Sequence, residues 1–177
     1  AGEGFKRPTN LIKEKYICLV IDKKNNSVGT NETASAELSS LMGGNYFSYP
    51  KPMSLIEHLI NFVLDEDDIV LDFFAGSGTT GHAVFNWCSG RKPARFILVQ
   101  LQENLADSLA VTSDPGAKLV LQNGIDFLEK LGRLPLLSEL TKIRLKKASL
   151  IHKESTYSNG CAIDSGFRVL TVESSNM

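Results

Sequence analysis

The spacing of hydrophobic residues changes several times along this chain, and each change predicts a different element. Apolar residues recur every three or four positions over 53–63, which predicts a helix. The run 69–72 predicts a short strand, and 95–103 predicts a second strand that is apolar enough to be buried on both faces of a sheet. Between these strands the pattern is helical from Thr79 and stops near Gly90.

The flanking segments carry weaker patterns. Residues 15–22 are rich in β-branched and aromatic residues and predict a strand, whereas 23–45 are dense in Asn, Ser, Thr and Gly and predict a long loop. Residues 117–134 fit either a helix or a strand followed by a helix, and periodicity leaves both open. The segment 136–151 predicts an amphipathic helix with a basic end, and 167–172 predicts a final strand.

The order of the central elements defines the fold class. Helix, strand, helix and strand follow one another, which predicts an α/β fold in which neighbouring strands are parallel. A length of 177 residues suits one domain with extensions.

Composition and charge narrow the functional classes. The chain is 42% hydrophobic and 22% charged, as globular proteins are, and its net charge of −1 gives no overall attraction to nucleic acid. Three widely spaced cysteines and three scattered histidines form no metal-ligand pattern, so we expect a reduced, cytoplasmic protein without a metal site. No apolar run has the length of a membrane span, and the N-terminus lacks a signal-peptide pattern.

The stretch IVLDFFAGSGTTGHAV, residues 69–84, places a glycine turn between a strand and a helix. Gly76 and Gly78 allow a tight turn and a close approach of the backbone to a ligand, and the start of the next helix attracts negative charge. Glu103 follows 22 residues after the last glycine of a GxGxxG pattern, where a carboxylate can accept hydrogen bonds from ribose hydroxyls. Two cofactors therefore compete, a nicotinamide dinucleotide and S-adenosylmethionine.

Charge separates these two cofactors. Asp72, four residues before the first glycine, would repel an anionic pyrophosphate but can lie near the ammonium and sulfonium of S-adenosylmethionine. The residues DFFA also lengthen the turn, whereas a dinucleotide strand normally runs straight into the first glycine. No Lys-Ser or Lys-Thr follows the glycines, which excludes a P-loop. We therefore favour S-adenosylmethionine, and keep a dinucleotide and a turn without ligand as alternatives.

Three segments of the sequence resemble those of a known family. FSYPKPMSLIEHLI, DDIVLDFFAGSGTTGHAV and RFILVQLQE are similar to amino-group DNA methyltransferases of the β permutation, above all the modification subunits of type III restriction–modification systems. The resemblance covers roughly 45–177. It implies a Rossmann-like S-adenosylmethionine-dependent methyltransferase fold with a mostly parallel sheet. It also implies a division into 1–44, a strand and loop that end an upstream region, and 45–177, the cofactor-binding part.

The resemblance implies roles for individual residues. A glycine loop beginning at Asp72 would hold the cofactor, the segment around Lys51 would close over its methionine end, and Glu103 would bind the ribose. Phe73 belongs to the candidate set by its place in the motif, although we expect its ring to pack beneath the sheet. The candidate cofactor residues are Tyr49, Lys51, Pro52, Ser54, Asp72, Phe73, Phe74, Ala75, Gly76, Gly78, Thr79, Thr80 and Glu103.

One family motif is missing from the sequence. Amino methyltransferases carry a short Asp/Asn/Ser-Pro-Pro-aromatic motif that binds the target amine and stacks on the extruded base. This chain has no Pro-Pro pair, so we assign no catalytic residue. Because the family places that motif before the cofactor loop, we expect it upstream of Ala1. The chain is then the C-terminal part of a larger enzyme and is inactive alone.

The resemblance also implies a reaction and partners. The intact protein is expected to methylate the N6 amine of adenine in double-stranded DNA, to form a homodimer, and to join a restriction subunit of the same system. An NAD(P)-dependent oxidoreductase and a non-catalytic remnant that acts as an interaction module remain alternatives. The basic residues Arg144, Lys146 and Lys147 are expected to be solvated charges at a helix end, with contact to DNA phosphate as the alternative.

Overall fold

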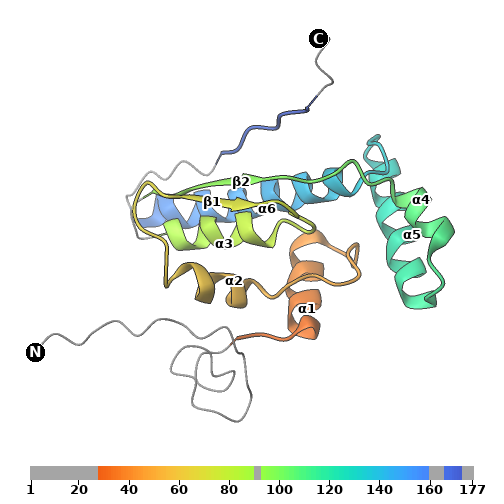
Figure 1. The fold of residues 1–177 in the computed structure, drawn as a ribbon, viewed down its shortest axis with the longest axis horizontal. Helices are drawn as coiled ribbons and strands as arrows, with labels where there is room; N and C mark the ends of the chain where they lie inside the picture. Colours follow the sequence, from red (N-terminus) through yellow and green to blue (C-terminus); the bar gives the residue numbers. More distant parts are fainter. Residues whose placement is uncertain (1–27, 90–92, 160–165, 173–177) are drawn as a thin grey trace, which may run out of the picture.

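The computed structural model describes residues 28–89, 93–159 and 166–172, so the strand predicted at 15–22 lies outside the described residues. No helix within these ranges is both long and apolar enough to cross a membrane. The elements, shown in Figure 1, are α1 (Asn31–Met42), α2 (Met53–Ile60), β1 (Ile69–Asp72), α3 (Thr79–Cys88), β2 (Arg95–Leu98), α4 (Leu105–Val111), α5 (Pro115–Lys130) and α6 (Leu137–Asn159).

Strands β1 and β2 form a parallel pair, with Ile69 opposite Arg95 and Asp72 opposite Leu98. Both strands therefore end at the same edge of the sheet, and the segments that follow them meet there. The predicted α/β class and the parallel pairing are confirmed. The described residues contain one two-stranded sheet, so the Rossmann-like strand order stays a prediction.

The two faces of the sheet differ. On one face Phe96 and Leu98 pack with Phe85 of α3 and Leu145 of α6. On the other face the side chains of β1 and β2 stay about half exposed, as Ile97 is. The prediction that 95–103 is a strand buried on both faces is wrong, because β2 ends at Leu98 and alternates between exposed and half-buried positions.

Helix α1 corrects the prediction of a long loop at 23–45. Thr30 caps the helix by accepting a hydrogen bond from the N–H of Thr33, and Ala34, Leu38 and Met42 are buried at every fourth position. Within the described residues of this segment, Thr30 occupies the cap, and Asn31, Thr33 and Ser40 lie on the exposed face of the helix. Two of the buried side chains of α1 share a core cluster with α4, α5 and α6. The buried members of this cluster are Leu38, Met42, Phe47, Leu105, Ile125, Leu128 and Leu140.

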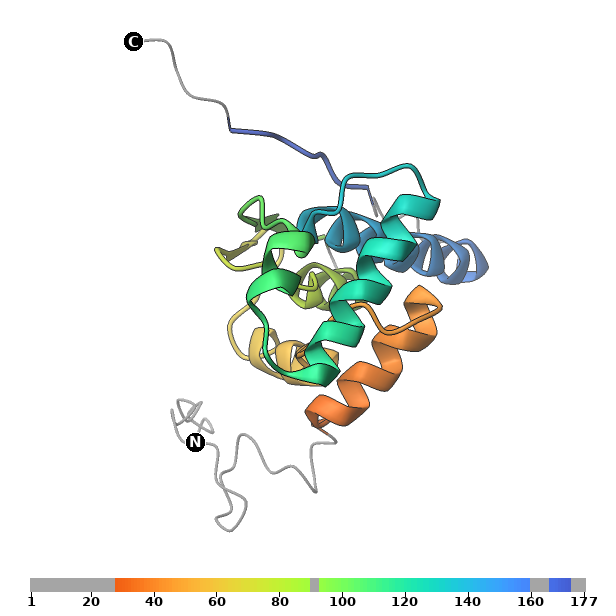
Figure 2. The same cartoon turned by 90° about the vertical axis from the view of Figure 1, so that its right-hand side faces the viewer.

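Between β2 and Asn159 the regular elements are the helices α4, α5 and α6, as the two views in Figure 1 and Figure 2 show. The ambiguous segment 117–134 is the helix α5, which begins at Pro115 under a cap from the side chain of Asp114. Helix α6 confirms the predicted amphipathic helix, but it continues to Asn159, so the basic residues within 144–147 that were expected at its end lie near its middle. The strand predicted at 167–172 is wrong, because this segment forms no strand with any other described residues and its Val172 is 98% exposed.

Candidate cofactor site

The loop between β1 and α3 is closed by the side chain of Asp72. One carboxylate oxygen, Oδ1, accepts a hydrogen bond from the N–H of Phe74 at 2.9 Å. The other, Oδ2, accepts one from the hydroxyl of Thr80 in the first turn of α3 at 2.6 Å. The carboxylate therefore joins the end of the strand to the start of the helix. A role toward a cationic ligand stays a prediction, although each carboxylate oxygen retains a lone pair for a further donor.

Glycines in the loop and in the first turn of α3 are needed for two reasons, a left-handed backbone conformation and close packing against α6. Gly76 and Gly78 have φ angles of +48° and +79°, in the left-handed region that other residues rarely adopt. A Cβ on Gly78 would also lie 3.0 Å from Cγ2 of Thr141. A Cβ on Gly81 would lie 2.7 Å from Cδ2 of Leu145, so this glycine allows close packing of α3 against α6.

Helix α6 supports the loop from behind through two polar side chains. The hydroxyl of Thr141 donates to the carbonyl oxygen of Gly76 at 2.5 Å. The guanidinium of Arg144 donates from Nη1 to the hydroxyl and carbonyl oxygens of Ser77, at 2.8 and 3.2 Å, and to the hydroxyl of Thr79 at 2.9 Å. Arg144 is 4% exposed. The loop is therefore hydrogen-bonded to a buried guanidinium cation.

Burial shifts the titration of the groups around this cation. Desolvation lowers the pKa of Arg144 to about 10, against the opposite effect of the Glu37 charge on α1. Burial, followed by the charges of Arg144 and His152, lowers the pKa of His82 to about 3. Arg144 therefore stays charged and His82 neutral at pH 7.

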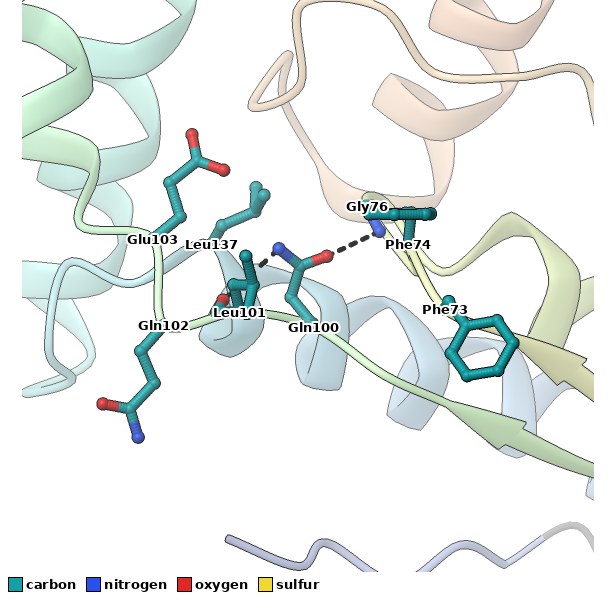
Figure 3. Close-up of a pocket in the computed structure, with 8 residues that line it drawn as sticks. All are labelled: Phe73, Phe74, Gly76, Gln100, Leu101, Gln102, Glu103 and Leu137. Atoms are coloured by element: carbon teal, nitrogen blue, oxygen red, sulfur yellow. Dashed lines mark hydrogen bonds between the residues drawn. The ribbon is translucent and has the colours of Figure 1, made fainter. Parts of the chain in front are cut away.

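An open groove of about 510 Å³ lies where the two strands end. Figure 3 shows the side chains that line it and the hydrogen bond that joins its two walls, from the N–H of Gly76 to Oε1 of Gln100 at 2.8 Å. Glu103 and Gln102 point to opposite sides of the segment after β2. The lining residues are Phe73, Phe74, Gly76, Gln100, Leu101, Gln102, Glu103 and Leu137.

The groove brings together four of the sequence-predicted residues, namely Phe73, Phe74, Gly76 and Glu103. Phe73 is 64% exposed, so the expectation that it packs beneath the sheet is wrong. The carboxylate of Glu103 accepts a hydrogen bond from the hydroxyl of Ser108 at 2.9 Å and remains exposed.

The other predicted residues lie around the loop. Ala75 is buried and donates its N–H to the carbonyl oxygen of Val99 at 3.0 Å, which joins the loop to the segment after β2. Thr79 donates its hydroxyl to the carbonyl oxygen of Lys51 at 3.3 Å. The segment around Lys51 therefore touches the loop through its backbone.

The side chains of that segment do not line the groove. Tyr49 is 72% exposed, Lys51 is exposed, and Pro52 is buried as the residue that precedes α2. The hydroxyl of Ser54 accepts a hydrogen bond from the N–H of Gly29 at 2.9 Å.

Sequence reasoning missed the contribution of α6. The prediction for Arg144, a solvated charge or a phosphate contact, is wrong because the side chain is buried under the loop. The same prediction is wrong for Lys147, which donates to the last carbonyl oxygens of α1, those of Leu41 and Met42, whereas Lys146 is exposed as expected. A signal was present, because Thr141 and Arg144 lie on the same helical stripe as the apolar residues of α6, namely Leu137, Leu140, Leu145 and Ala148.

These features define a class of protein. A strand, a left-handed glycine turn, a helix and a groove at the carboxyl ends of parallel strands are typical of nucleotide-cofactor sites in α/β proteins. Within the described ranges, no group of three or more His, Cys, Asp and Glu side chains could hold a metal ion.

Comparison with known proteins makes the class specific. A family model described as DNA methylase matches residues 12–110, more than half of the chain. The chain therefore belongs to this DNA methylase family. The match favours a methyltransferase over the nicotinamide-dependent alternative.

Individual relatives of this chain match segments of about 60 residues at 42–52% identity. The Mod subunit of the type III restriction–modification enzyme StyLTI of Salmonella typhimurium is 48% identical over 58 residues, 33% of this chain and 9% of that protein. The EcoP15I Mod subunit of Escherichia coli is 52% identical over 62 residues, 34% of this chain and 10% of that protein. The type II methyltransferase M.KpnI of Klebsiella pneumoniae is 42% identical over 59 residues, 33% of this chain and 14% of that protein. The resemblance to type III modification subunits is confirmed, and the matches span about a tenth of those two Mod subunits.

Proposed function

We propose that this chain is the S-adenosylmethionine-binding part of a type III DNA methyltransferase that methylates the N6 amine of adenine. In this proposal the amine-binding motif lies outside the chain, which contains no Pro-Pro pair. The intact protein would act on double-stranded DNA as a homodimer and join a restriction subunit.

The observation that carries the proposal is the groove at the carboxyl ends of β1 and β2. One wall is the left-handed glycine loop, whose backbone can approach a ligand closely. The exposed rings of Phe73 and Phe74 offer apolar surface to a nucleoside. Glu103 offers an exposed carboxylate to hydroxyl groups, and its place beyond the second strand matches the ribose-binding acid of nucleotide folds. The residues present therefore fit the cofactor.

Each part of the site would have its own task. S-adenosylmethionine, when bound, supplies a methyl group already activated by its sulfonium. The start of α3 would face the carboxylate of the cofactor, and Asp72 would hold the loop in the shape that allows this. Positioning of the reactants then carries most of the catalysis, because little acid–base chemistry is needed before the methyl transfer.

Titration calorimetry with S-adenosylmethionine on the whole chain tests the cofactor site. We expect saturable binding, and a loss of affinity of about tenfold in Glu103→Gln, because a charged hydrogen-bond acceptor is removed. The matched control is Glu129→Gln on the exposed surface of α5, which should bind as the wild type does. NADH should give no heat. Absence of S-adenosylmethionine binding, or saturable NADH binding instead, would contradict the proposal.

A separate measurement tests the missing motif. The chain alone should transfer no methyl group from labelled S-adenosylmethionine to DNA, and detectable transfer would show that the amine-binding residues are present. Sequencing the DNA upstream of the coding region should reveal a Pro-Pro-aromatic motif in frame. Its absence would favour a non-catalytic remnant.

A further inference from the structure

The most unusual polar group outside the groove is the guanidinium of Arg144. It is 4% exposed, and its three described hydrogen bonds through Nη1 all go to the glycine loop, to two oxygens of Ser77 and one of Thr79. Burial of a charge is costly unless hydrogen bonds and an opposite charge compensate it. A methionine or leucine at this position of an apolar helical stripe would avoid that cost. Packing alone therefore does not explain why a charged side chain occupies this buried position.

The contacts of Arg144 show what the charge does to the loop. A single nitrogen holds the hydroxyls of Ser77 and Thr79, which also lie 3.0 Å from each other. One turn earlier on α6, Thr141 holds the carbonyl oxygen of Gly76. Gly76, Ser77 and Thr79 are thus held on α6 through their backbone or side-chain oxygens. With its oxygens bound behind, the loop can keep one conformation in the absence of a ligand.

The charge also affects the opposite side of the loop. A buried cation close to the start of α3 adds to the positive potential of that helix end, and both attract an anionic group at the loop. The charge of Glu37 on α1 compensates part of this positive charge, because it raises the pKa of Arg144 against the larger effect of desolvation. The only carboxylate of S-adenosylmethionine is at its amino-acid end.

We infer that Arg144 is a positioning residue that holds the glycine loop ready for the amino-acid end of the cofactor. This inference rests on the proposed cofactor site. It assigns to Arg144 a selective effect, because ligands that have the amino-acid carboxylate depend on the arginine and ligands that lack it do not.

Two ligands separate this role from general structural support. S-adenosylhomocysteine has the nucleoside and the amino-acid end, whereas methylthioadenosine has the nucleoside and no amino-acid end. Titration calorimetry compares both on the whole chain for wild type, Arg144→Met, Arg144→Lys and the control Lys146→Met, which changes an exposed lysine of the same helix.

Arg144→Met is expected to lower the affinity for S-adenosylhomocysteine by at least about tenfold. The affinity for methylthioadenosine should change by less than about twofold. Arg144→Lys keeps the charge without the guanidinium geometry and should give an intermediate loss. Lys146→Met should leave the affinity for both ligands unchanged. Equal losses for both ligands, or no loss for either, would overturn the inference.

A measurement without ligand keeps the inference testable if Arg144→Met fails to fold. Hydrogen–deuterium exchange of amides 76–80 should be faster in Arg144→Lys and in Thr141→Val than in wild type, while amides of α5 stay unchanged. Unchanged exchange in the loop contradicts a positioning role. If the wild type binds neither compound, the proposed function fails, and this exchange experiment still decides whether Arg144 and Thr141 hold the loop.

Discussion

The two walls of the groove are built in opposite ways. In the loop wall Phe73 and Phe74 are exposed, but residues 75–79 are buried except for Gly76, and α6 holds this buried part through Thr141 and Arg144. In the segment after β2, residues 100–103, all positions but Gln100 are exposed. The second wall is held through its backbone, by a hydrogen bond from the N–H of Leu137, the first residue of α6, to the carbonyl oxygen of Glu103 at 2.9 Å.

The difference suggests a division of labour in the proposed site. A buried polar network has few alternative arrangements, because each hydrogen bond that is lost costs free energy, so we expect the loop wall to be the more rigid of the two. An exposed segment can adjust its side chains without such a cost. We therefore expect changes in the loop wall to act on stability and changes in the other wall to act mainly on the ligand.

The largest effect is expected for Gly78→Ala in the loop wall. The alanine would adopt a left-handed conformation and meet Thr141 at 3.0 Å, so we expect a loss of about 3 kcal/mol in the free energy of unfolding. Gly43→Ala is the matched control, because Gly43 has a φ angle of +83° and no atom within 4 Å of its added Cβ. It should lose only about 1–2 kcal/mol. Urea unfolding measures both, and equal losses would mean that α6 does not restrain the loop.

The next effect is a pH dependence of the free energy of unfolding, which arises from His82 on α3, the helix that follows the loop. Its folded-state pKa of about 3 lies below its ordinary 6.5, so the unfolded chain binds a proton that the folded chain does not. Stability should therefore fall as the pH drops below 6.5, by about 2 kcal/mol at pH 5. His82→Gln should remove most of this fall. His152 keeps a part of it, since burial also lowers the pKa of that group.

Urea unfolding between pH 7 and pH 4.5 checks the prediction for His82. The control is Gln102→Ala, which changes an exposed side chain without a titratable group and should keep the wild-type slope. A wild-type slope in His82→Gln as well would contradict the desolvated, neutral state of His82.

A smaller effect is expected where the walls meet. Gln100→Ala removes the acceptor of the Gly76 N–H, and we expect a loss of about 1 kcal/mol in the free energy of unfolding. Gln102→Ala is the control, because Gln102 lies in the same exposed segment and points the other way (Figure 3). Thermal unfolding of the two variants should differ, and identical midpoints would show that the bridge between the walls contributes nothing.

The smallest effect is expected for Lys146→Ala on α6. This lysine is exposed, so the free energy of unfolding should change by less than about 0.5 kcal/mol. Lys147→Ala should cost more, about 1 kcal/mol, because Lys147 binds the carbonyl oxygens at the end of α1. Equal effects in urea unfolding would contradict the role of Lys147 at that helix end.

Local patterns predicted the elements that frame the groove. The helical spacing over 53–63, the strand that ends at Asp72 and the helix that begins at Thr79 all appear in the structure. Composition misled at 23–45, where Asn, Ser and Thr suggested a loop. The fourfold spacing of Ala34, Leu38 and Met42 carried the correct information there.

By itself, the sequence determined the central strand–turn–helix unit and the family, because glycine spacing and hydrophobic periodicity act over a few residues. Tertiary structure alone decided that Arg144 and Thr141 support the loop, since they lie more than sixty positions from it along the chain. A helical stripe shows which residues turn inward, but what they meet depends on packing between distant elements. A charge in such a stripe has either a buried partner or a solvated end, and only the fold selects between them.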